Sequence, residues 1–438
     1  MYPDWPDSAA DLVPLPQCIG PKLNPFDFHG PQKIIFREYI GEGRHSFVFK
    51  VEIHGNMYAL KLVSKELLSA FTCIIMNKTL TPWQFRFDYV RDWIGIADEF
   101  DEKDITAAAT MYNYSEPFSC ECRSFGRLQE SGCEDLAVKC FGYILLDEEH
   151  ERAMRDKFAD IDLEFDGNVD CPGYWPMRSL YPGKSGRPPP IRGIVKELGS
   201  QAETLNMKVL RRYLDDIKRF QQLGIIQLDV AERQFIGGKI CDFSTAVTLP
   251  HIMTNSELSP HLPSAIQPYM EYQTFLLSIS DYWSYDVMIQ DWHHDHEPKT
   301  EILARAFPSR NGCNIKYDLR KTPSRNRVYT FVDPRKYDWK KFTASVETDA
   351  GALPQGDPRT RLGKRKRSQT SNGNRVVISK TRPRFDKRPP RWYYRCGERM
   401  TAFLKEKAEY SSHLQWFSKD GLVFPRRGDY AWNEGRWS

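Results

Sequence analysis

The chain has 438 residues, of which 40% are hydrophobic and 13% aromatic, and its formal net charge is only +4. This length and composition can supply the core of a two-lobed domain with extensions. The sequence has no apolar run of about 18 residues, and its start lacks the basic and apolar regions of a secretory signal, so neither a membrane span nor secretion is expected. Ten cysteines without framework spacing indicate reduced thiols in a nucleocytoplasmic protein.

A glycine-containing turn follows a proline-rich extension over residues 1–30. Residues 40–48 match the pattern G-x-G-x-x-[GS]-x-V, with Gly41, Gly43 and Ser46 at the small positions. Glycines at a strand turn let backbone N–H groups approach phosphate oxygens, because no Cβ is in the way. The segment predicts a phosphate-binding loop, although this pattern is weak when it stands alone.

The next strand carries a lysine, and a predicted helix offers it a carboxylate. Lys61 lies in the strand-like run of residues 57–63, where a lysine suits the α- and β-phosphates of a nucleotide; a surface lysine on an edge strand is the alternative. Apolar residues at helical spacing predict a helix over residues 117–130. We expect Glu121 of this helix, rather than Glu130, to pair with Lys61, and an exposed helix face is the alternative.

A strand and an amphipathic helix come next in the chain. Residues 191–199 read as a buried strand that runs into a loop at Glu197, where an adenine would lie against it. Residues 207–223 carry an apolar stripe, and Gly224 stands where a helix commonly ends.

Two aspartates flank a predicted hairpin between residues 225 and 243. The Gly237-Gly238 pair lies between two strand-like dipeptides and suits a two-residue turn, which needs positive φ. The pairing brings Asp242 back toward Asp229. Two such carboxylates suit a divalent cation and a proton acceptor, whereas a solvated hairpin with two unrelated aspartates is the alternative.

The order of these elements resembles that of a protein kinase. The stretches CECRSFGRL, IVKELG and LDVAERQF…ICDFS resemble the fungal kinetochore-associated family described as the Fta-two-type subunit of the Sim-four complex, a kinase-like group. The resemblance extends from about residue 31 to about residue 250. It implies a bilobal α+β fold with a small antiparallel β lobe and a mainly α-helical, reduced C-lobe.

Site residues follow from the resemblance by position. ATP and Mg²⁺ are the cofactors that such a site takes. The resemblance implies nucleotide contacts from Gly41, Gly43, Ser46, Val48, Ala59, Lys61 and Glu197. It implies Asp229 as the catalytic-loop acid with Lys61 and Glu121, and Asp242 and Gln234 as metal-site residues.

Several positions depart from the pattern of active kinases. Gln227 and Leu228 replace His-Arg before Asp229, Gln234 replaces an asparagine, and Ser244 replaces a glycine. The longer glutamine misplaces its carbonyl by ~1.5 Å, an error comparable to those that cost about 10²-fold in rate. We therefore expect a nuclear adaptor or subunit of a kinetochore or chromatin assembly, compatible with nucleotide binding and with weak or no phosphoryl transfer. The alternative is an active ATP- and Mg²⁺-dependent Ser/Thr protein kinase using Asp229 and Asp242.

The remaining stretches suggest domain boundaries. Asp281 begins an Asp-Tyr-Trp-Ser run that is similar to a kinase C-lobe helix, and a plain amphipathic helix is the alternative. The expected division is an extension over 1–30, an N-lobe over 31–145 with an insertion at 64–116, an acidic and Pro/Gly-rich insertion over 146–190, a reduced C-lobe over 191–342, a basic disordered linker over 343–390 and an aromatic segment over 391–438. The insertion over 146–190 is expected to be a solvated loop or a partner-binding excursion.

Positive charge is concentrated near the end of the chain. From Arg359 to Arg395 there are fourteen Lys/Arg and one acid, Asp386, which leaves about +13 in this stretch. The tetrad Lys364–Arg367 matches a nuclear-import signal and would also suit phosphate backbones; a solubilising linker is the alternative. The aromatic residues that follow could stack on nucleic acid, but packing on the chain's own domain is favoured.

Overall fold

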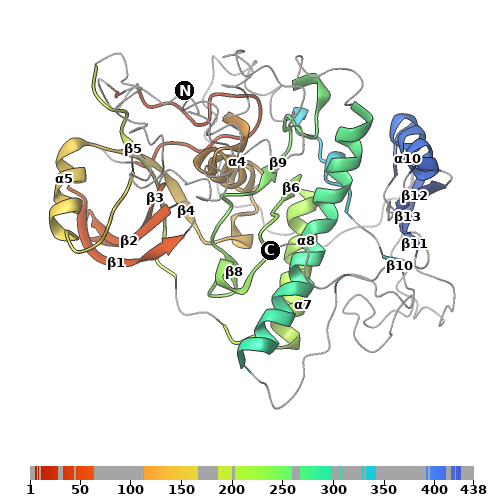
Figure 1. Ribbon diagram of the computed structural model, residues 1–438. Helices are drawn as coiled ribbons and strands as arrows, with labels where there is room; N and C mark the ends of the chain where they lie inside the picture. The colour runs from red at the N-terminus through yellow and green to blue at the C-terminus, as the bar shows by residue number, and fades with distance from the viewer. Residues whose placement is uncertain are drawn as a thin grey trace, which may run out of the picture.

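The computed structural model describes residues 5–6, 8, 11–27, 33–43, 46–63, 110, 113–165, 186–199, 203–258, 267–296, 306, 328–329, 332–341, 391–392, 395–410, 416–419 and 421–425. They form a mixed α/β fold. Figure 1 shows a sheet on one side, helix α4 in the middle and the long helices α7 and α8 beyond it.

A five-stranded antiparallel sheet forms the first part of the fold. Its strand order is β1-β2-β3-β5-β4. The strands are β1 (Ile35–Gly43), β2 (Ser46–Ile53), β3 (Asn56–Val63), β4 (Cys140–Leu146) and β5 (Ile191–Glu197). Alternation in β2 buries Phe47, Phe49 and Val51 on one face, as expected when successive side chains point to opposite sides.

That face is covered by helix α5 (Glu148–Lys157). The ring of Phe158, just past the helix, lies 5.2 Å from that of Phe49. The expectation of a solvated loop or partner-binding excursion over residues 146–190 is therefore wrong for its first part. His150, Met154 and Phe158 recur every four residues and form a buried stripe that the surrounding acids obscured. Residues 166–185 lie outside the described residues.

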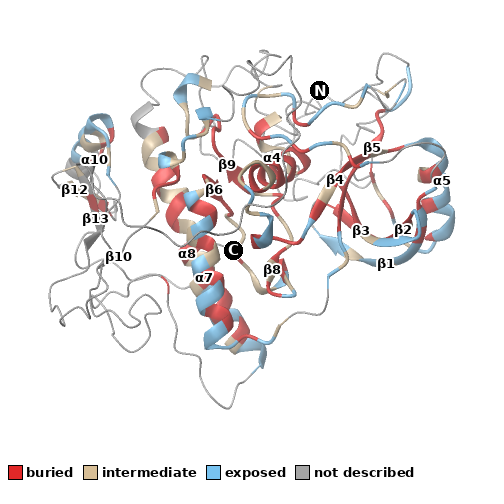
Figure 2. Cartoon of the chain, turned by 180° about the vertical axis from the view of Figure 1, so that it is seen from behind, coloured by how far each residue is buried: buried red, intermediate tan, exposed pale blue. Residues whose placement is uncertain are grey.

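Helix α4 (Pro117–Glu130) packs on the other face of the sheet and is buried on nearly all sides. Pro117 stands at its first position, and Glu116 caps it by accepting the N–H of Ser119 at 3.0 Å. Figure 2 shows α4 as an almost continuously buried helix in the centre of the molecule. A helix so enclosed can bring polar side chains into sites shielded from water.

The N-terminal segment, residues 11–27, forms one of the covers of α4. Leu15 and Leu23 exchange two backbone hydrogen bonds, of 3.0 and 2.8 Å, and Phe26 N donates to Tyr143 O of β4 at 2.7 Å. Gly126 of α4 lies so close that a Cβ there would come within 2.4 Å of Lys22 O. Part of the predicted extension is thus a component of the core.

Helices and short hairpins make up the second part. Helix α7 (Met207–Gln222) begins at Asn206, which accepts the N–H groups of its first turn, and is followed by Gly224 at φ +72°, as predicted. The hairpin of β7 (Phe235–Ile236) and β8 (Lys239–Ile240) turns at two glycines with positive φ, which confirms that prediction. A two-stranded sheet pairs β6 (Ile225–Ile226) with β9 (Val247–Thr248).

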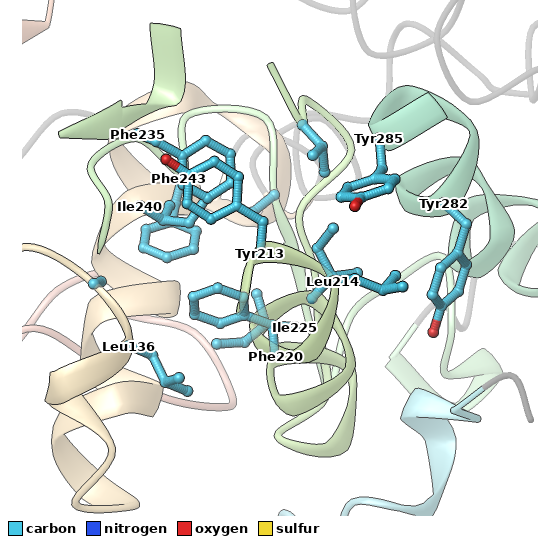
Figure 3. Packing of buried hydrophobic residues seen from close by; sticks show 14 of the residues in the cluster. Leu136, Tyr213, Leu214, Phe220, Ile225, Phe235, Ile240, Phe243, Tyr282 and Tyr285 are labelled. Carbon is cyan, nitrogen blue, oxygen red and sulfur yellow. The ribbon is translucent and has the colours of Figure 1, made fainter. Parts of the chain in front are cut away.

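Helix α8 (Gln267–His296) runs beside α7. In Figure 3, Tyr213 and Leu214 of α7 pack with Phe235 and with Tyr285 of α8 in one apolar core. The rings of Tyr213 and Phe235 are stacked at 3.5 Å. Among the described residues, no helix is long and apolar enough to cross a bilayer.

The aromatic C-terminal segment packs back onto α8, as its composition predicted. It contains α10 (Glu398–Tyr410), β12 (Trp416–Lys419) and β13 (Leu422–Pro425), while β10 (Val328–Tyr329) pairs with β11 (Arg391–Trp392). Trp416 is buried, with its ring 4.9 Å from that of Phe275. Glu271 of α8 accepts from Gly397 N at 2.6 Å and from Arg335 Nη1 at 2.7 Å, and therefore joins two distant stretches of chain.

A buried charge cluster as the candidate functional site

The sheet and α4 meet at a buried ion pair. Lys61 of β3 bonds through Nζ to Glu121 Oε1 of α4, and their side chains are 6% and 0% exposed. Glu130 lies two and a half turns further along the helix and pairs with Arg127 instead, at 2.5 Å. The structure thus brings together the lysine and the glutamate that the sequence suggested.

Asp242 joins this pair from the loop after β8. Its Oδ1 accepts from Lys61 Nζ at 2.7 Å and from Ser244 N at 2.8 Å. Phe243 fixes the loop, because its ring packs edge-on against Phe125 of α4 and Phe220 of α7, at 5.1 and 5.5 Å. The position of the Asp242 carboxylate is therefore fixed by contacts of the next residue with both α4 and α7.

A second lysine, which the sequence reasoning missed, completes the cluster. Lys196 Nζ lies 2.6 Å from Glu121 Oε2 and donates to Cys241 O at 2.8 Å. The contact with Oε2 lacks the alignment of a hydrogen bond and is an ion pair by proximity. The sequence offers one partial signal, a lysine that directly follows Ile194-Val195 of a predicted buried strand, but it does not show that strand pairing places this lysine near Lys61.

Burial and charge act in opposite directions on these groups. Burial raises the pKa of Glu121, and Lys196 and then Lys61 oppose this rise. Burial alone would raise the pKa of Asp242, but Lys61 and Lys196 hold it well below its usual range. Burial likewise favours neutral Lys61, yet Asp242 and Glu121 raise the pKa of the ammonium group above its ordinary value. The cluster contains two lysines and two carboxylates, so it is close to neutral.

Two arginines of α4 hold the helix in this position. Arg123 donates to Thr248 O and Ile19 O, both at 2.9 Å, and also to Pro250 O. Arg127 donates to Leu249 O at 2.5 Å. These bonds tie α4 to the segment that follows Phe243 and to the N-terminal segment, so Glu121 has little freedom to move away from Lys61.

The predicted catalytic-loop acid is bonded to residues of its own loop. Both oxygens of Asp229 accept from Arg233 Nη2, at 2.8 and 2.7 Å, and Gln234 Nε2 donates to its Oδ2 at 2.6 Å. Among the described residues, no hydrogen bond or ion pair joins Asp229 or Gln234 to Asp242. The bonds thus join Gln234 to Asp229 and Asp242 to Lys61.

A buried aspartate of α8 supports the loop before Asp229. Asp281 accepts from Leu228 N at 2.7 Å, Gln227 N at 3.2 Å and Gln221 Nε2 at 3.0 Å. Leu228 has φ +68°, a conformation that a branched side chain rarely adopts. The sequence pattern that begins at Asp281 thus coincides with a structural support for the loop.

The nucleotide residues implied by resemblance have mixed surroundings. Val48 and Ala59 are half-buried and lie on the same sheet face as Lys61, because Val48 pairs with Lys61 across β2 and β3. Gly41 and Gly43 close the β1–β2 hairpin, where Gly43 pairs with Ser46. Glu197 is exposed, and its carboxylate accepts from Lys139 N at 3.3 Å.

The two implied cofactor groups fit these residues differently. The glycines, Lys61 and the half-buried Val48 and Ala59 are compatible with a nucleotide. The two implied metal-site residues have separate contacts: Asp242 Oδ1 accepts from Lys61 Nζ, and Gln234 Nε2 donates to Asp229. Among the described residues, no group of three or more His, Cys, Asp or Glu could hold a metal ion.

Fold and site together define an α/β protein in which an antiparallel sheet, a central helix and a hairpin loop are joined by a buried lysine–carboxylate cluster. Residues 12–247 match the family model described as kinetochore Sim4 complex subunit FTA2, which is more than half of the chain. The chain belongs to this family. It is therefore a kinetochore-associated subunit of a protein complex, and the matched region contains the whole cluster. A search of curated proteins gave no match.

Proposed function

We propose that the chain is a kinetochore adaptor that has a bilobal kinase-like fold and transfers no phosphoryl group. One observation carries the proposal: the carboxylates that transfer would need are bonded to side-chain donors of the protein itself. Asp242 accepts from Lys61, and Asp229 accepts from Arg233 and Gln234. In this arrangement the site has a structural role: it joins the sheet and α4 to the loop after β8, and so stabilises the fold that partners of the complex would bind.

Four features support the kinase-like fold. They are the Lys61–Glu121 pair between sheet and helix, the placement of Phe243 between α4 and α7, the β7–β8 hairpin that separates two aspartates, and the support of the preceding loop by Asp281. A kinase uses these positions for the phosphate lysine, the helix glutamate, the catalytic base and the metal. ATP, where bound, would meet Lys61 and the glycine loop and would serve as a structural ligand.

Phosphoryl transfer depends on positioning and on charge stabilisation at the transferring group. Gln227 and Leu228 replace the histidine and arginine of an active catalytic loop. Gln234 directs its amide to Asp229 at 2.6 Å. These replacements, together with the Gln234–Asp229 bond, support an adaptor that transfers no phosphoryl group.

The second candidate is an active ATP- and Mg²⁺-dependent protein kinase, which the buried Lys61–Glu121 pair favours. A transfer assay separates the two: the purified chain is incubated with γ-labelled ATP and Mg²⁺ or Mn²⁺, alone and with basic protein substrates. The adaptor predicts no more label than the Asp242→Asn variant takes up. Labelling by the wild type that both Asp242→Asn and Lys61→Met abolish would establish the kinase and refute the adaptor.

We propose further that the adaptor acts in the nucleus and that the basic stretch directs it there. The tetrad Lys364–Arg367 lies outside the described residues, and its role rests on the sequence alone. Replacing the four residues with alanine should reduce nuclear accumulation of a fluorescent fusion, while Lys405→Ala in α10 should not. Unchanged accumulation would assign import to another signal. Loss of DNA or RNA binding by the same variant would show that the stretch also contacts nucleic acid.

A further inference from the structure

The ammonium group of Lys196 lies among oxygen atoms. Its Nζ is 2.6 Å from Glu121 Oε2, and it donates to Cys241 O at 2.8 Å. Carboxylate and carbonyl oxygens around a buried positive charge are the donor set that Mg²⁺ and Ca²⁺ take in proteins. The surroundings of this ammonium group therefore have the chemistry of a cation site.

Strand register explains how the side chain reaches this place. Lys196 pairs with Ala59, which is two residues before Lys61 on β3, so both lysines leave the same face of the sheet. The ring of Phe125 lies 5.0 Å from Lys196 Nζ and covers a further side of the ammonium group. The side chain of Lys196 is 6% exposed. The packing thus holds the charge in one position.

The charges of the cluster leave no need for a further cation. Lys61 contacts Glu121 and Asp242, while Lys196 contacts Glu121. Two positive and two negative side chains balance each other. A divalent ion added to them would leave two uncompensated positive charges in a poorly solvated place, which is strongly unfavourable. Without Lys196, the same place would contain two carboxylates, one carbonyl oxygen and a single lysine.

We propose that Lys196 takes the place of a divalent cation in this cluster, so that the cluster is complete without metal and excludes Mg²⁺ and Mn²⁺. Glu121 Oε2 and the Cys241 carbonyl are the oxygen atoms that its ammonium group contacts, and Asp242 is the second carboxylate of the cluster. The proposal rests on the kinase-like site of the proposed function, but its test does not involve phosphoryl transfer. Phosphoryl transfer in the assay described above would refute the adaptor function. The metal-binding measurement tests only the role proposed for Lys196.

The experiment measures Mn²⁺ binding and melting temperature of the purified full chain, in EDTA and in a Mn²⁺ titration. Wild type should show no saturable Mn²⁺ site in the cluster and equal melting temperatures in both conditions. Lys196→Met should melt lower in EDTA, gain one saturable Mn²⁺ site and recover several degrees when it is filled. The double variant Lys196→Met/Asp242→Asn should lose this recovery.

Lys50→Met is the matched control, because Lys50 lies in the same sheet but pairs with Glu38 outside the cluster. It should behave like wild type toward Mn²⁺. Lys196→Gln serves if the methionine variant does not fold, since glutamine removes the charge and keeps a donor for the Cys241 carbonyl. The proposal is overturned if wild type binds Mn²⁺ in a manner that Asp242→Asn abolishes. It is equally overturned if a folded, uncharged variant at position 196 gains no Mn²⁺ site.

Discussion

Asp281 Oδ1 accepts the backbone N–H of Leu228 at 2.7 Å, and Leu228 has φ +68°. The residue that follows is Asp229, so a carboxylate on α8 stabilises an unfavourable backbone conformation directly before the candidate acid. Burial raises the pKa of Asp281 to about 6. An ionisable group is retained in the core here because three N–H donors converge on it.

Replacing Asp281 with asparagine should destabilise the fold. The new amide N–H₂ would face at least one of the N–H donors from Gln221, Gln227 and Leu228, and leaving a buried group unpaired costs about 1–3 kcal/mol. Urea unfolding measures the loss. Asp291→Asn is the control on the same helix, because Asp291 is exposed and its replacement should leave the midpoint unchanged. Equal midpoints for the two variants would contradict the role given to Asp281.

His251 should make the protein less stable in mild acid. Its Nδ1 accepts from Met253 N at 3.2 Å, so Nε2 carries the proton that it shares with Tyr114 O at 2.9 Å. Burial, with a further contribution from Arg123, lowers the pKa of His251 to about 3 from 6.5. Between these values the unfolded state binds more protons, so this stabilisation is complete above pH 6.5 and is lost as pH falls.

The loss attributable to His251 at pH 5 should be about 2 kcal/mol relative to pH 7. Asp281, with its raised pKa, acts in the opposite direction over part of this range, so the measurement compares wild type with His251→Gln at each pH. Glutamine cannot be protonated and can still donate to Tyr114 O. From pH 7 to pH 5, the unfolding free energy of wild type should fall relative to that of His251→Gln. A constant gap would argue against a buried neutral histidine.

Arg123→Met should weaken the attachment of α4 to the rest of the fold. The variant leaves the carbonyl groups of Ile19 and Thr248 without the guanidinium that now donates to both at 2.9 Å. Hydrogen bonds to charged groups contribute about 1.5–3 kcal/mol each, so we expect a loss of a few kcal/mol in unfolding free energy. Arg211→Met on the exposed face of α7 should change stability by less than about 0.5 kcal/mol. Similar losses in the two variants would mean that the arginine of α4 is not an anchor.

The change in stability caused by Gly126→Ala should have opposite signs in the full chain and in a chain that lacks residues 1–27. In the full chain the added Cβ would meet the backbone of Lys22 at 2.4 Å, and we expect destabilisation of about 1–3 kcal/mol. In a chain that lacks residues 1–27 that contact is gone, and alanine should stabilise the helix by up to about 1 kcal/mol. Thermal unfolding of the four proteins completes the cycle. The same sign in both backgrounds would show that the N-terminal segment does not pack on α4 in solution.

Local patterns in the sequence predicted the elements well. The apolar stripe and Gly224 located α7, and Gly237-Gly238 located the hairpin, because these signals act between residues close in the chain. The sequence also suggested Glu121 over Glu130 for the contact with Lys61. Helix α5 was missed because its buried stripe is interrupted by acids, and composition outweighed periodicity in that interpretation.

Long-range register could not be predicted. Lys196 reaches the cluster only because β3 and β5, separated by more than 120 residues, pair Ala59 with Lys196; a shift of one residue would turn the lysine to the opposite face. The packing of residues 11–27 on α4 depends on the close approach of the Lys22 backbone to Gly126 and on the hydrogen bond from Arg123 to Ile19 O. Neither contact produces a periodic hydrophobic pattern in this proline-rich stretch.

Glu271 binds both Arg335 and Gly397, and the whole basic stretch lies between these two residues in the chain. A tether that departs from and returns to one point reaches no further than half its contour length, here roughly 100 Å for about thirty residues in each direction. The lysines and arginines of the stretch are consequently confined to this distance from Glu271 of α8. A segment of the same length that was attached at one end only could extend about twice as far.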